Sequence, residues 1–108
     1  MADFSLSDLA NIIAERARAG DASSSYTARL IAEGVAKCAR KFGEEAVEAT
    51  IAAISESDAA LTAEAGDVLY HLLVVLQARN IPLGAVMAEL EGRTRQGGLA
   101  EKAARPKP

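Results

Sequence analysis

The sequence predicts an all-α fold, a bundle of about five helices joined by short connections. Alanine supplies 24 of the 108 residues, and it is the strongest helix former and a weak strand former. Apolar residues recur at helical spacing along most of the chain, and no segment shows a competing strand pattern. Hydrophobic residues make up 50% and charged residues 25%, proportions that exclude a disordered or low-complexity chain.

The first two predicted helices are short and begin at serine caps. Ser5 and Asp8 have the spacing of a capping box, and the helical pattern that follows them stops at Gly20. A loop of small polar residues leads to a second helix that begins at Tyr26, with one of the two preceding serines as its cap. Gly34 marks the break before the next helix.

Two long helices and a shorter one complete the predicted bundle. A helix over residues 35–54 is followed by a polar turn at residues 55–58, which caps a second long helix over residues 59–79. Pro82 fits the first turn of a last helix that ends near Arg93.

We expect one domain over residues 1–96 and a flexible C-terminal tail over residues 97–108. The stretch 68–76 is apolar nearly all round its helix, and a small monomeric bundle cannot cover that many faces. The alanine-rich core is also thin, and a chain of this length gains little stability from one core. The sequence therefore predicts a homodimer with helices packed across a two-fold axis.

Charge and cysteine content narrow the function classes. The net charge is −3, from 12 basic and 15 acidic residues, so the basic excess of a nucleic-acid-binding surface is missing. The single cysteine, Cys38, cannot form an internal disulfide, which suits a reducing compartment. No signal-peptide pattern is present, and the longest strongly apolar stretch, residues 72–76, is far shorter than the ~20 residues that span a bilayer. We expect a cytoplasmic protein without a nucleic-acid or membrane partner.

Two acidic pairs are candidates for a functional site. Glu45 and Glu48 lie one turn apart on one face of the first long helix, next to Glu44. Glu64 and Asp67 are arranged in the same way on the second long helix. The turn between these helices has arms of similar length on either side, so antiparallel packing should bring both pairs to the same level. The sequence therefore predicts a cluster of carboxylates at one point.

Such a cluster is typical of a metal site. Carboxylates gathered at one point repel one another unless a cation lies between them, and their hard oxygen atoms suit Mg²⁺, with Mn²⁺ as an alternative. Both pairs could instead be ordinary solvated helix faces, because such two-residue motifs are common. The metal site is favoured because the second pair begins a largely apolar helix, where freely solvated carboxylates are not expected.

Basic residues lie on the same stripe as the first acidic pair. Lys37 and Lys41 share that helix face, and ammonium groups beside a cation would suit a polyphosphate substrate. Lys41 and Glu45 could equally form a simple surface ion pair. Arg16, Arg18, Arg29 and Arg40 are further candidates whose directions the sequence does not fix.

His71 is the only histidine of the chain and lies one turn beyond Asp67 on the same face. It could support a metal ligand or carry a proton. A histidine on such a helix is more often a hydrogen-bonded structural group. It does not complete a Glu-x-x-His pair, so the di-iron pattern of ferritin-like bundles is absent.

Three sequence blocks occur in order along the chain: S-Y-T-x-x-L at residues 25–30, K-F-G-E-E-A-x-E at residues 41–48 and D-x-x-Y-H-L-L at residues 67–73. Together they resemble the phosphoribosyl-ATP pyrophosphohydrolase family, and the resemblance covers nearly the whole chain. It implies a MazG-like all-α bundle. It also implies Mg²⁺-dependent hydrolysis of 1-(5-phosphoribosyl)-ATP to 1-(5-phosphoribosyl)-AMP and pyrophosphate, the second step of histidine biosynthesis. Two residues depart from the family pattern: Gly66, where alanine is usual, and Gly97, where serine is usual.

The resemblance assigns roles to the acidic residues. The metal pattern of the family, E-x-x-E followed by E-x-x-D, falls on the two acidic pairs, so the expected ligands are Glu45, Glu48, Glu64 and Asp67. One carboxylate should orient or deprotonate the attacking water, and the expected catalytic residues are Glu44, Glu45 and Glu48.

Lys37 and Lys41 are expected to bind phosphate and to stabilise charge that develops on the leaving pyrophosphate. Further substrate contacts are expected from Tyr26, Thr27 and Arg40, although Tyr26 could equally anchor its short helix by hydrophobic packing.

Two other functions stay open at this point. A house-cleaning nucleotide pyrophosphatase of the same superfamily would use the same four acids. A non-catalytic helical assembly module would carry them only as solvated side chains.

Overall fold

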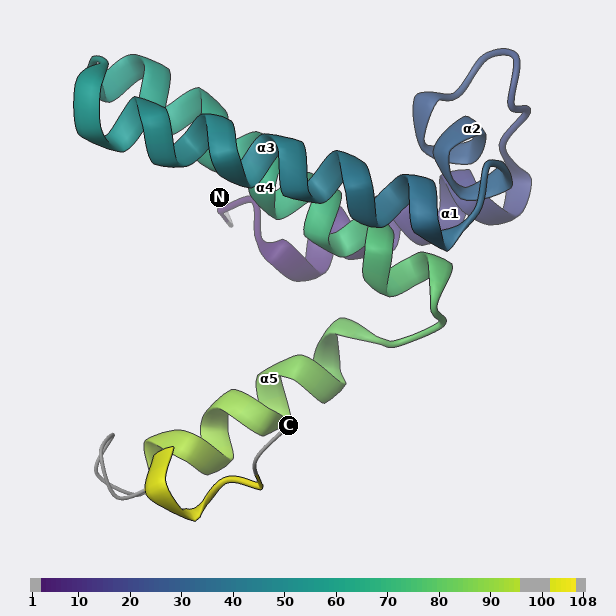
Figure 1. The fold of residues 1–108 in the computed structure, drawn as a ribbon. Coiled ribbons are helices and arrows are strands. Elements are labelled where there is room, and N and C mark those ends of the chain that lie inside the picture. The colour runs from purple at the N-terminus through teal and green to yellow at the C-terminus, as the bar shows by residue number, and fades with distance from the viewer. Residues whose placement is uncertain (1–2, 96–101, 107–108) are drawn as a thin grey trace.

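The computed structural model describes residues 3–95 and 102–106, and within these residues it contains helices and no strands (Figure 1). The all-α prediction is therefore confirmed. Residues 102–104 add one helical turn. The remaining helices are α1 (Leu6–Ala19), α2 (Tyr26–Ala32), α3 (Val35–Ser55), α4 (Asp58–Ala78) and α5 (Leu83–Thr94).

Side-chain caps fix where the helices begin. The Ser5 hydroxyl accepts a hydrogen bond from the Asp8 backbone N–H, and the Asp8 carboxylate accepts one from the Ser5 N–H, which is the predicted capping box. Ser25 caps α2 and Ser57 caps α4, and each hydroxyl accepts a hydrogen bond from the backbone N–H of the third residue of its helix. Pro82 occupies the N-cap of α5 in an extended conformation, one residue before the helical position predicted for it.

Gly34 separates α2 from α3 and has a φ of +103°, a conformation that side chains with a Cβ rarely adopt. A Cβ at this position would meet no heavy atom within 4 Å. The backbone conformation alone therefore requires glycine here, and the tight break between the two helices depends on it.

We expect Gly34→Ala to lower the free energy of unfolding by about 1–2 kcal/mol, because alanine disfavours positive φ. Gly66→Ala is the matched control, since Gly66 lies inside α4 with the same open space around it. It should raise stability by about 0.5–1 kcal/mol by favouring the helix. Urea unfolding measures both changes, and shifts of the same sign would contradict this account.

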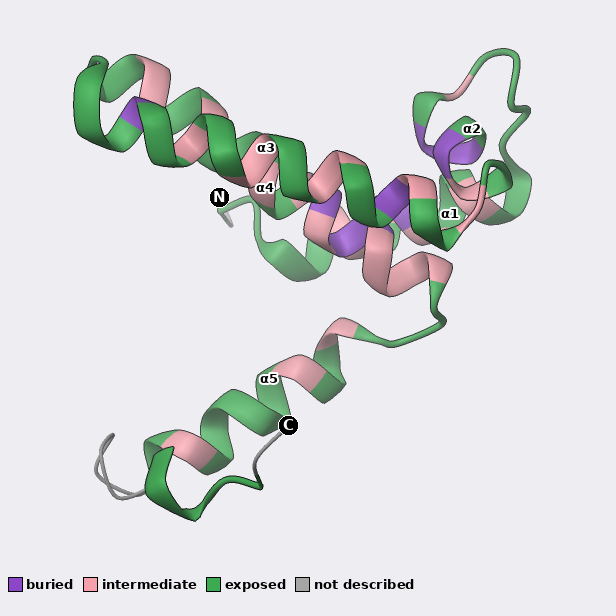
Figure 2. Cartoon of the chain, viewed as in Figure 1, coloured by how far each residue is buried: buried purple, intermediate pink, exposed green. Residues whose placement is uncertain are grey.

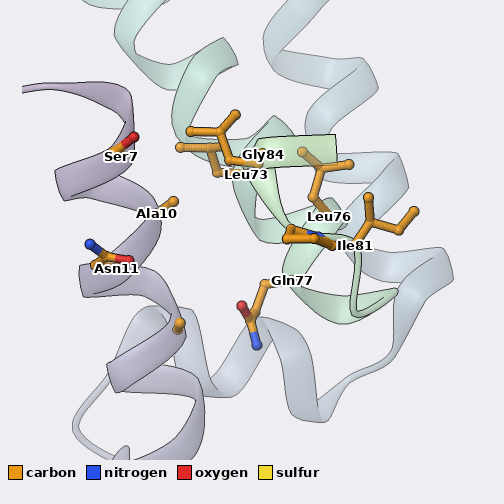
Figure 3. A pocket seen from close by; sticks show the side chains of 11 residues that line it. Ser7, Ala10, Asn11, Leu73, Leu76, Gln77, Ile81 and Gly84 are labelled. Atoms are coloured by element: carbon orange, nitrogen blue, oxygen red, sulfur yellow. The ribbon is translucent and has the colours of Figure 1, made fainter. Parts of the chain in front are cut away.

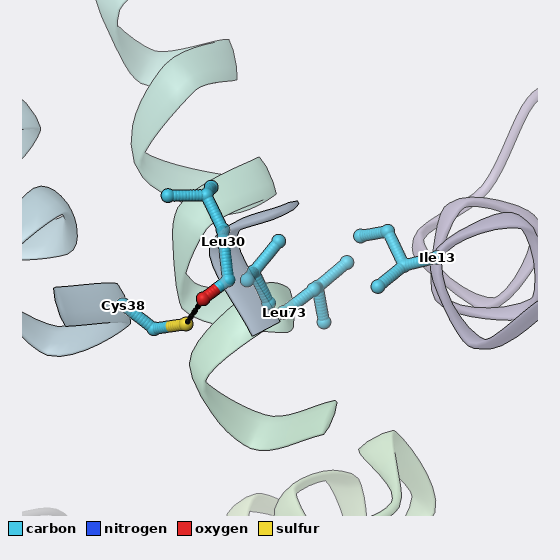
Figure 4. Packing of buried hydrophobic residues seen from close by; sticks show 5 residues of the cluster. Ile13, Leu30, Cys38 and Leu73 are labelled. Atoms are coloured by element: carbon cyan, nitrogen blue, oxygen red, sulfur yellow. Dashed lines mark hydrogen bonds between the residues drawn. The ribbon is translucent and has the colours of Figure 1, made fainter. Parts of the chain in front are cut away.

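The core lies where α1 and α2 pack against one end of the α3–α4 hairpin (Figures 1 and 2). Its buried residues are Ile13, Leu30, Cys38, Leu73 and Val74, which come from all four helices (Figure 4). The Cys38 thiol donates a hydrogen bond to the Leu30 carbonyl oxygen at 3.2 Å, and burial raises the pKa of this thiol. Cys38 is therefore a packing residue that stays protonated.

α4 is the central helix, because it packs against α1, α2 and α3. By length and composition it is also apolar enough to cross a membrane. The sequence estimate, which counted only residues 72–76 as strongly apolar, was too short, because the whole helix passes this test. We interpret α4 as the core helix of a bundle, since it contributes three buried residues, His71, Leu73 and Val74, to the contacts with its neighbours.

α5 diverges from the other helices and has no buried residue (Figure 1). A hollow of about 300 Å³ lies between α1, the end of α4 and the start of α5, with Asn11, Leu73 and Ile81 among its lining residues (Figure 3). The radius of gyration is 15.9 Å, against about 13 Å for a compact chain of this size. Large hydrophobic side chains such as Ile54 and Met87 are exposed, so the single chain leaves apolar surface uncovered.

The boundary predicted at residue 96, together with residues 97–101 and 107–108 of the predicted tail, lies outside the described residues.

Candidate active site

Three of the predicted carboxylates converge between α3 and α4. Glu45, Glu48 and Glu64 each offer a carboxylate oxygen, and these oxygens lie within 4.8 Å of one another. Glu45 and Glu48 lie one turn apart on α3, and the short turn at the end of α3 places Glu64 of α4 opposite them. The antiparallel packing predicted from the equal arms of the turn produces this arrangement.

The electrostatics of the cluster follow from burial and like charge. Burial raises the pKa of Glu45, and a hydrogen bond with Glu48 and the charges of Glu48 and Asp67 raise it further, while nearby His71 acts in the opposite direction. Burial also raises the pKa of Glu64, with further contributions from the charges of Glu48 and Asp67. The carboxylates therefore carry a concentration of negative charge that a cation would stabilise.

Glu64 gives a direct test of whether the cluster fits a metal ion. Its Oε2 atom is buried and has no hydrogen-bond partner within the described part of the chain. A buried carboxylate oxygen without a partner is costly, and a divalent cation would satisfy it. Three convergent carboxylate oxygens are also the hard ligands that Mg²⁺ and Mn²⁺ take. The residues present fit such an ion.

Asp67, the fourth predicted ligand, is not part of this convergent group. It is exposed on α4 one turn beyond Glu64, close enough for its charge to raise the pKa of Glu45 and Glu64. Its backbone carbonyl oxygen lies 2.7 Å from Nδ1 of His71. The role of its carboxylate as a ligand stays a prediction.

Lys41 lies at the edge of the acidic cluster. Its Nζ atom is 3.3 Å from Oε1 of Glu44 and 3.8 Å from Oε1 of Glu45. The hydrogen bond to Glu44 is the largest of the effects that raise the pKa of Lys41. The ion pair foreseen between Lys41 and Glu45 is present, and it places an ammonium group directly beside the carboxylate cluster.

A basic hollow of about 330 Å³ adjoins Lys41. Lys37 lines it and forms an ion pair with Glu33 at 3.8 Å. Of the four arginines with undetermined directions, Arg29 lines the hollow, whereas Arg16, Arg18 and Arg40 do not. The complete lining is Tyr26, Arg29, Leu30, Glu33, Lys37 and Lys41.

The residues predicted to contact substrate differ in accessibility. Tyr26 is 44% exposed and lines the hollow, with the Arg29 guanidinium carbon 5.8 Å from its ring centroid. Thr27 is 2% exposed, and its hydroxyl is hydrogen-bonded to the Tyr70 hydroxyl. Thr27 therefore links α2 to α4 through this hydrogen bond. Because its side chain is buried, the structure does not support the predicted contact between Thr27 and the substrate.

Sequence reasoning missed Glu33 as part of this hollow. A signal was available, because Arg29, Glu33 and Lys37 recur every four residues. The spacing crosses the break at Gly34, however, so helical periodicity alone could not place these side chains on one surface.

The comparison with protein families decides the assignment of the chain. The family described as phosphoribosyl-ATP pyrophosphohydrolase matches residues 6–94, which include α1 to α5. The chain belongs to the phosphoribosyl-ATP pyrophosphohydrolase family.

Relatives with the name phosphoribosyl-ATP pyrophosphatase match this member of the family over its full length. The protein from Agrobacterium fabrum is 59% identical over 108 residues, as is that from Methylobacterium nodulans. The Rhizobium meliloti protein is 55% identical over 108 residues. Each alignment covers 100% of both chains. The resemblance carried by the three sequence blocks is therefore confirmed.

Proposed function

We propose that this chain hydrolyses 1-(5-phosphoribosyl)-ATP to 1-(5-phosphoribosyl)-AMP and pyrophosphate, the second step of histidine biosynthesis, with Mg²⁺ as its cofactor. The predicted enzyme class, a phosphoribosyl-ATP pyrophosphatase, is confirmed by the family and the relatives. The observation that carries the proposal for the site is the convergence of Glu45, Glu48 and Glu64 beside a basic hollow.

The acidic cluster would hold the metal ion. Glu45, Glu48 and Glu64 supply convergent oxygens, and Asp67 is the proposed fourth ligand. When bound, Mg²⁺ would neutralise phosphate oxygens and so favour attack on the phosphoanhydride. Mn²⁺ suits the same oxygen ligands.

The basic hollow would hold the phosphate chain. Lys37 and Lys41 line it, and their ammonium groups would stabilise the negative charge that develops on the leaving pyrophosphate. Tyr26 would form part of the wall that contacts the substrate. Arg40 is proposed as an outer contact, because it is exposed on α3 beside Lys41 in sequence.

A carboxylate beside the hollow would orient or deprotonate the attacking water. The candidates are Glu44, Glu45 and Glu48, of which the first two are adjacent on α3 and the third lies one turn further along. Glu44 is exposed and bonded to Lys41, and the same lysine lies 3.8 Å from the proposed ligand Glu45. This position suits a residue that orients water.

The decisive experiment measures pyrophosphate release from phosphoribosyl-ATP, with and without Mg²⁺, beside ordinary deoxynucleoside triphosphates. We expect turnover of phosphoribosyl-ATP that stops when a chelator is added and returns with Mg²⁺. Faster release from the deoxynucleoside triphosphates would instead identify a house-cleaning nucleotide pyrophosphatase. Equal release with chelator would contradict the metal site.

We also propose that the enzyme is a homodimer. Val47, Ile51 and Ile54 follow helical spacing on α3, and their side chains are 59%, 49% and 81% exposed. Leu69 on α4 is also exposed. A two-helix hairpin cannot bury both of its apolar faces, and a second copy of the hairpin would complete a four-helix bundle.

We place this enzyme and its small-molecule nucleotide substrate in the cytoplasm. Cys38 is a free, buried thiol, and free thiols suit a reducing compartment. The proposal involves no nucleic acid and no membrane.

A further inference from the structure

His71 joins the acidic side of α4 to the wall of the basic hollow. It is the only histidine of the chain and is 6% exposed. Its Nδ1 atom lies 2.7 Å from the backbone carbonyl oxygen of Asp67. A carbonyl oxygen can only accept, so the proton of this hydrogen bond is on Nδ1.

The second ring nitrogen of His71 faces α2. Its Nε2 atom lies 3.4 Å from the hydroxyl oxygen of Tyr26. When Nδ1 carries the only proton of the ring, Nε2 has a lone pair and accepts a hydrogen bond from the Tyr26 hydroxyl. The two hydrogen bonds orient the His71 ring and tie the first residue of α2 to the turn of α4 that carries Asp67.

Aromatic packing holds this arrangement in place. The His71 ring meets the Tyr70 ring edge-on, with centroids 5.0 Å apart, and meets the Tyr26 ring edge-on at 6.2 Å. The Tyr26 and Tyr70 rings are stacked at 6.3 Å. The imidazole is therefore oriented by two rings as well as by two hydrogen bonds.

The Tyr26 ring in turn contacts a cationic side chain, that of Arg29, at the hollow. The Arg29 guanidinium lies over the Tyr26 ring at 5.8 Å, within the range of a cation–π contact. Arg29 and Tyr26 line the hollow together with Lys37 and Lys41. The contacts thus run from the Asp67 carbonyl through His71 and Tyr26 to a guanidinium at the proposed phosphate site.

We propose that His71 is a positioning residue for substrate binding. It fixes the Tyr26 ring, and through that ring the Arg29 guanidinium, in the orientation that receives the phosphate chain. This role rests on the function proposed above. His71 itself touches neither substrate nor metal in this proposal, and its contribution is to substrate affinity.

The tautomer of His71 is the first test, and it needs no substrate. Because the chain has one histidine, ¹⁵N NMR of the Mg²⁺-loaded protein reports this ring alone. We expect the proton on Nδ1 and a bare Nε2, whose resonance shifts in Tyr26→Phe. A proton on Nε2 with a bare Nδ1, or an Nε2 resonance unchanged in Tyr26→Phe, would overturn the proposal.

A double-mutant cycle is the second test. Tyr26→Phe removes the hydroxyl but keeps the ring under Arg29, and His71→Asn removes the acceptor. Each should raise the KM for phosphoribosyl-ATP roughly threefold to tenfold, the loss typical of one hydrogen bond, with kcat within about twofold. The double variant should be no worse than either single variant. Effects that multiply independently would contradict the proposal.

Tyr70→Phe is the matched control, since it removes the other hydrogen bond between α2 and α4, that with Thr27, and keeps its ring. If His71 only stabilised the packing of α2, Tyr70→Phe would raise KM as much as Tyr26→Phe. We expect its KM to stay within about twofold of the wild type. Should His71→Asn fail to fold, the comparison of the two Tyr→Phe variants still decides the question.

The proposed function and the role of His71 fail in different ways. A wild-type protein that does not hydrolyse phosphoribosyl-ATP would contradict the proposed function, and the cycle would then be measured on the nucleotide that it does hydrolyse. An active wild type with independent effects of Tyr26→Phe and His71→Asn would contradict the role of His71 alone.

Discussion

Glu64→Gln is expected to abolish Mg²⁺-dependent turnover and, at the same time, to stabilise the metal-free protein at neutral pH. Glu64 contributes one of three convergent carboxylate oxygens, and its other oxygen is buried without a hydrogen-bond partner within the described residues. The loss of groups that merely support a metal ligand costs about 10–100-fold in activity. Loss of a ligand should therefore lower turnover by at least about 100-fold.

The stability change follows from the sign of the pKa shift. Folding raises the pKa of Glu64, so the folded state binds its proton more tightly than the unfolded state does. The folded state is therefore destabilised progressively as pH rises from the ordinary carboxyl pKa through the raised value, and this penalty is present at neutral pH. Glutamine does not titrate, so Glu64→Gln removes the contribution of residue 64 to the pH dependence of the free energy of unfolding. The contribution of Glu45, whose pKa is also raised, remains.

Urea unfolding in the presence of a chelator, at several pH values from acidic to neutral, measures this effect. Mg²⁺ at about 100 times its dissociation constant should stabilise the wild type by about 2.7 kcal/mol, a rise of roughly 10 °C in Tm. Glu64→Gln should show little of that rise. Turnover is measured on the same samples.

Glu15→Gln is the control for charge, because Glu15 is exposed on α1 and lies outside the cluster. It removes one negative charge and should change neither turnover nor the response to Mg²⁺. If Glu64→Gln kept more than about a hundredth of wild-type turnover with Mg²⁺, a loss smaller than ligand removal should cause, the assignment of Glu64 as a ligand would be wrong.

Backbone features were predictable from the sequence because local chemistry determines them. The serine caps at Ser5 and Ser25 and the break at Gly34 act over three or four residues, so their patterns placed the helix ends within about two residues. The meeting of Glu45 and Glu64 was also predictable, since a short turn leaves antiparallel helices only one register.

Side-chain directions across the α2–α4 contact were not predictable. Helical periodicity gives the face of each residue on its own helix, and the orientation of α2 depends on the loop before it and on the positive φ of Gly34. For this reason the burial of Thr27 and the position of Arg29 over Tyr26 emerged only from the structure. The position of the Asp67 carboxylate outside the convergent group likewise depends on its rotamer, which sequence spacing does not determine.

The direction of α5 was also not predictable from the sequence. Its apolar residues predicted a helix, but its exposed Met87 and Leu90 meet no core in the single chain. A helix of this kind gains stability from packing rather than from propensity. Like the apolar stripe on α3, α5 therefore needs a partner surface that the single chain does not supply.

Ile51→Lys is expected to dissociate the proposed homodimer. Ile51 lies in the middle of the exposed stripe with Val47 and Ile54, and two-fold symmetry makes one substitution act twice. About half of the side chain remains to be buried by a partner, so the two copies together would lose about 1.5–3 kcal/mol of apolar burial. That loss raises the dissociation constant roughly tenfold to hundredfold, and the buried ammonium adds to it.

Light scattering over a concentration series from high to low micromolar measures the change. The wild type should remain a dimer throughout, and Ile51→Lys should become a monomer as it is diluted. Ala53→Lys is the matched control, because Ala53 is exposed on α3 and lies at least about 100° round the helix from each residue of the stripe. It adds the same charge on the same helix and should leave the dimer intact. A monomeric wild type, or equal effects of the two lysines, would show that this stripe is not the interface, and the uncovered apolar surface of α3 would then need a different partner.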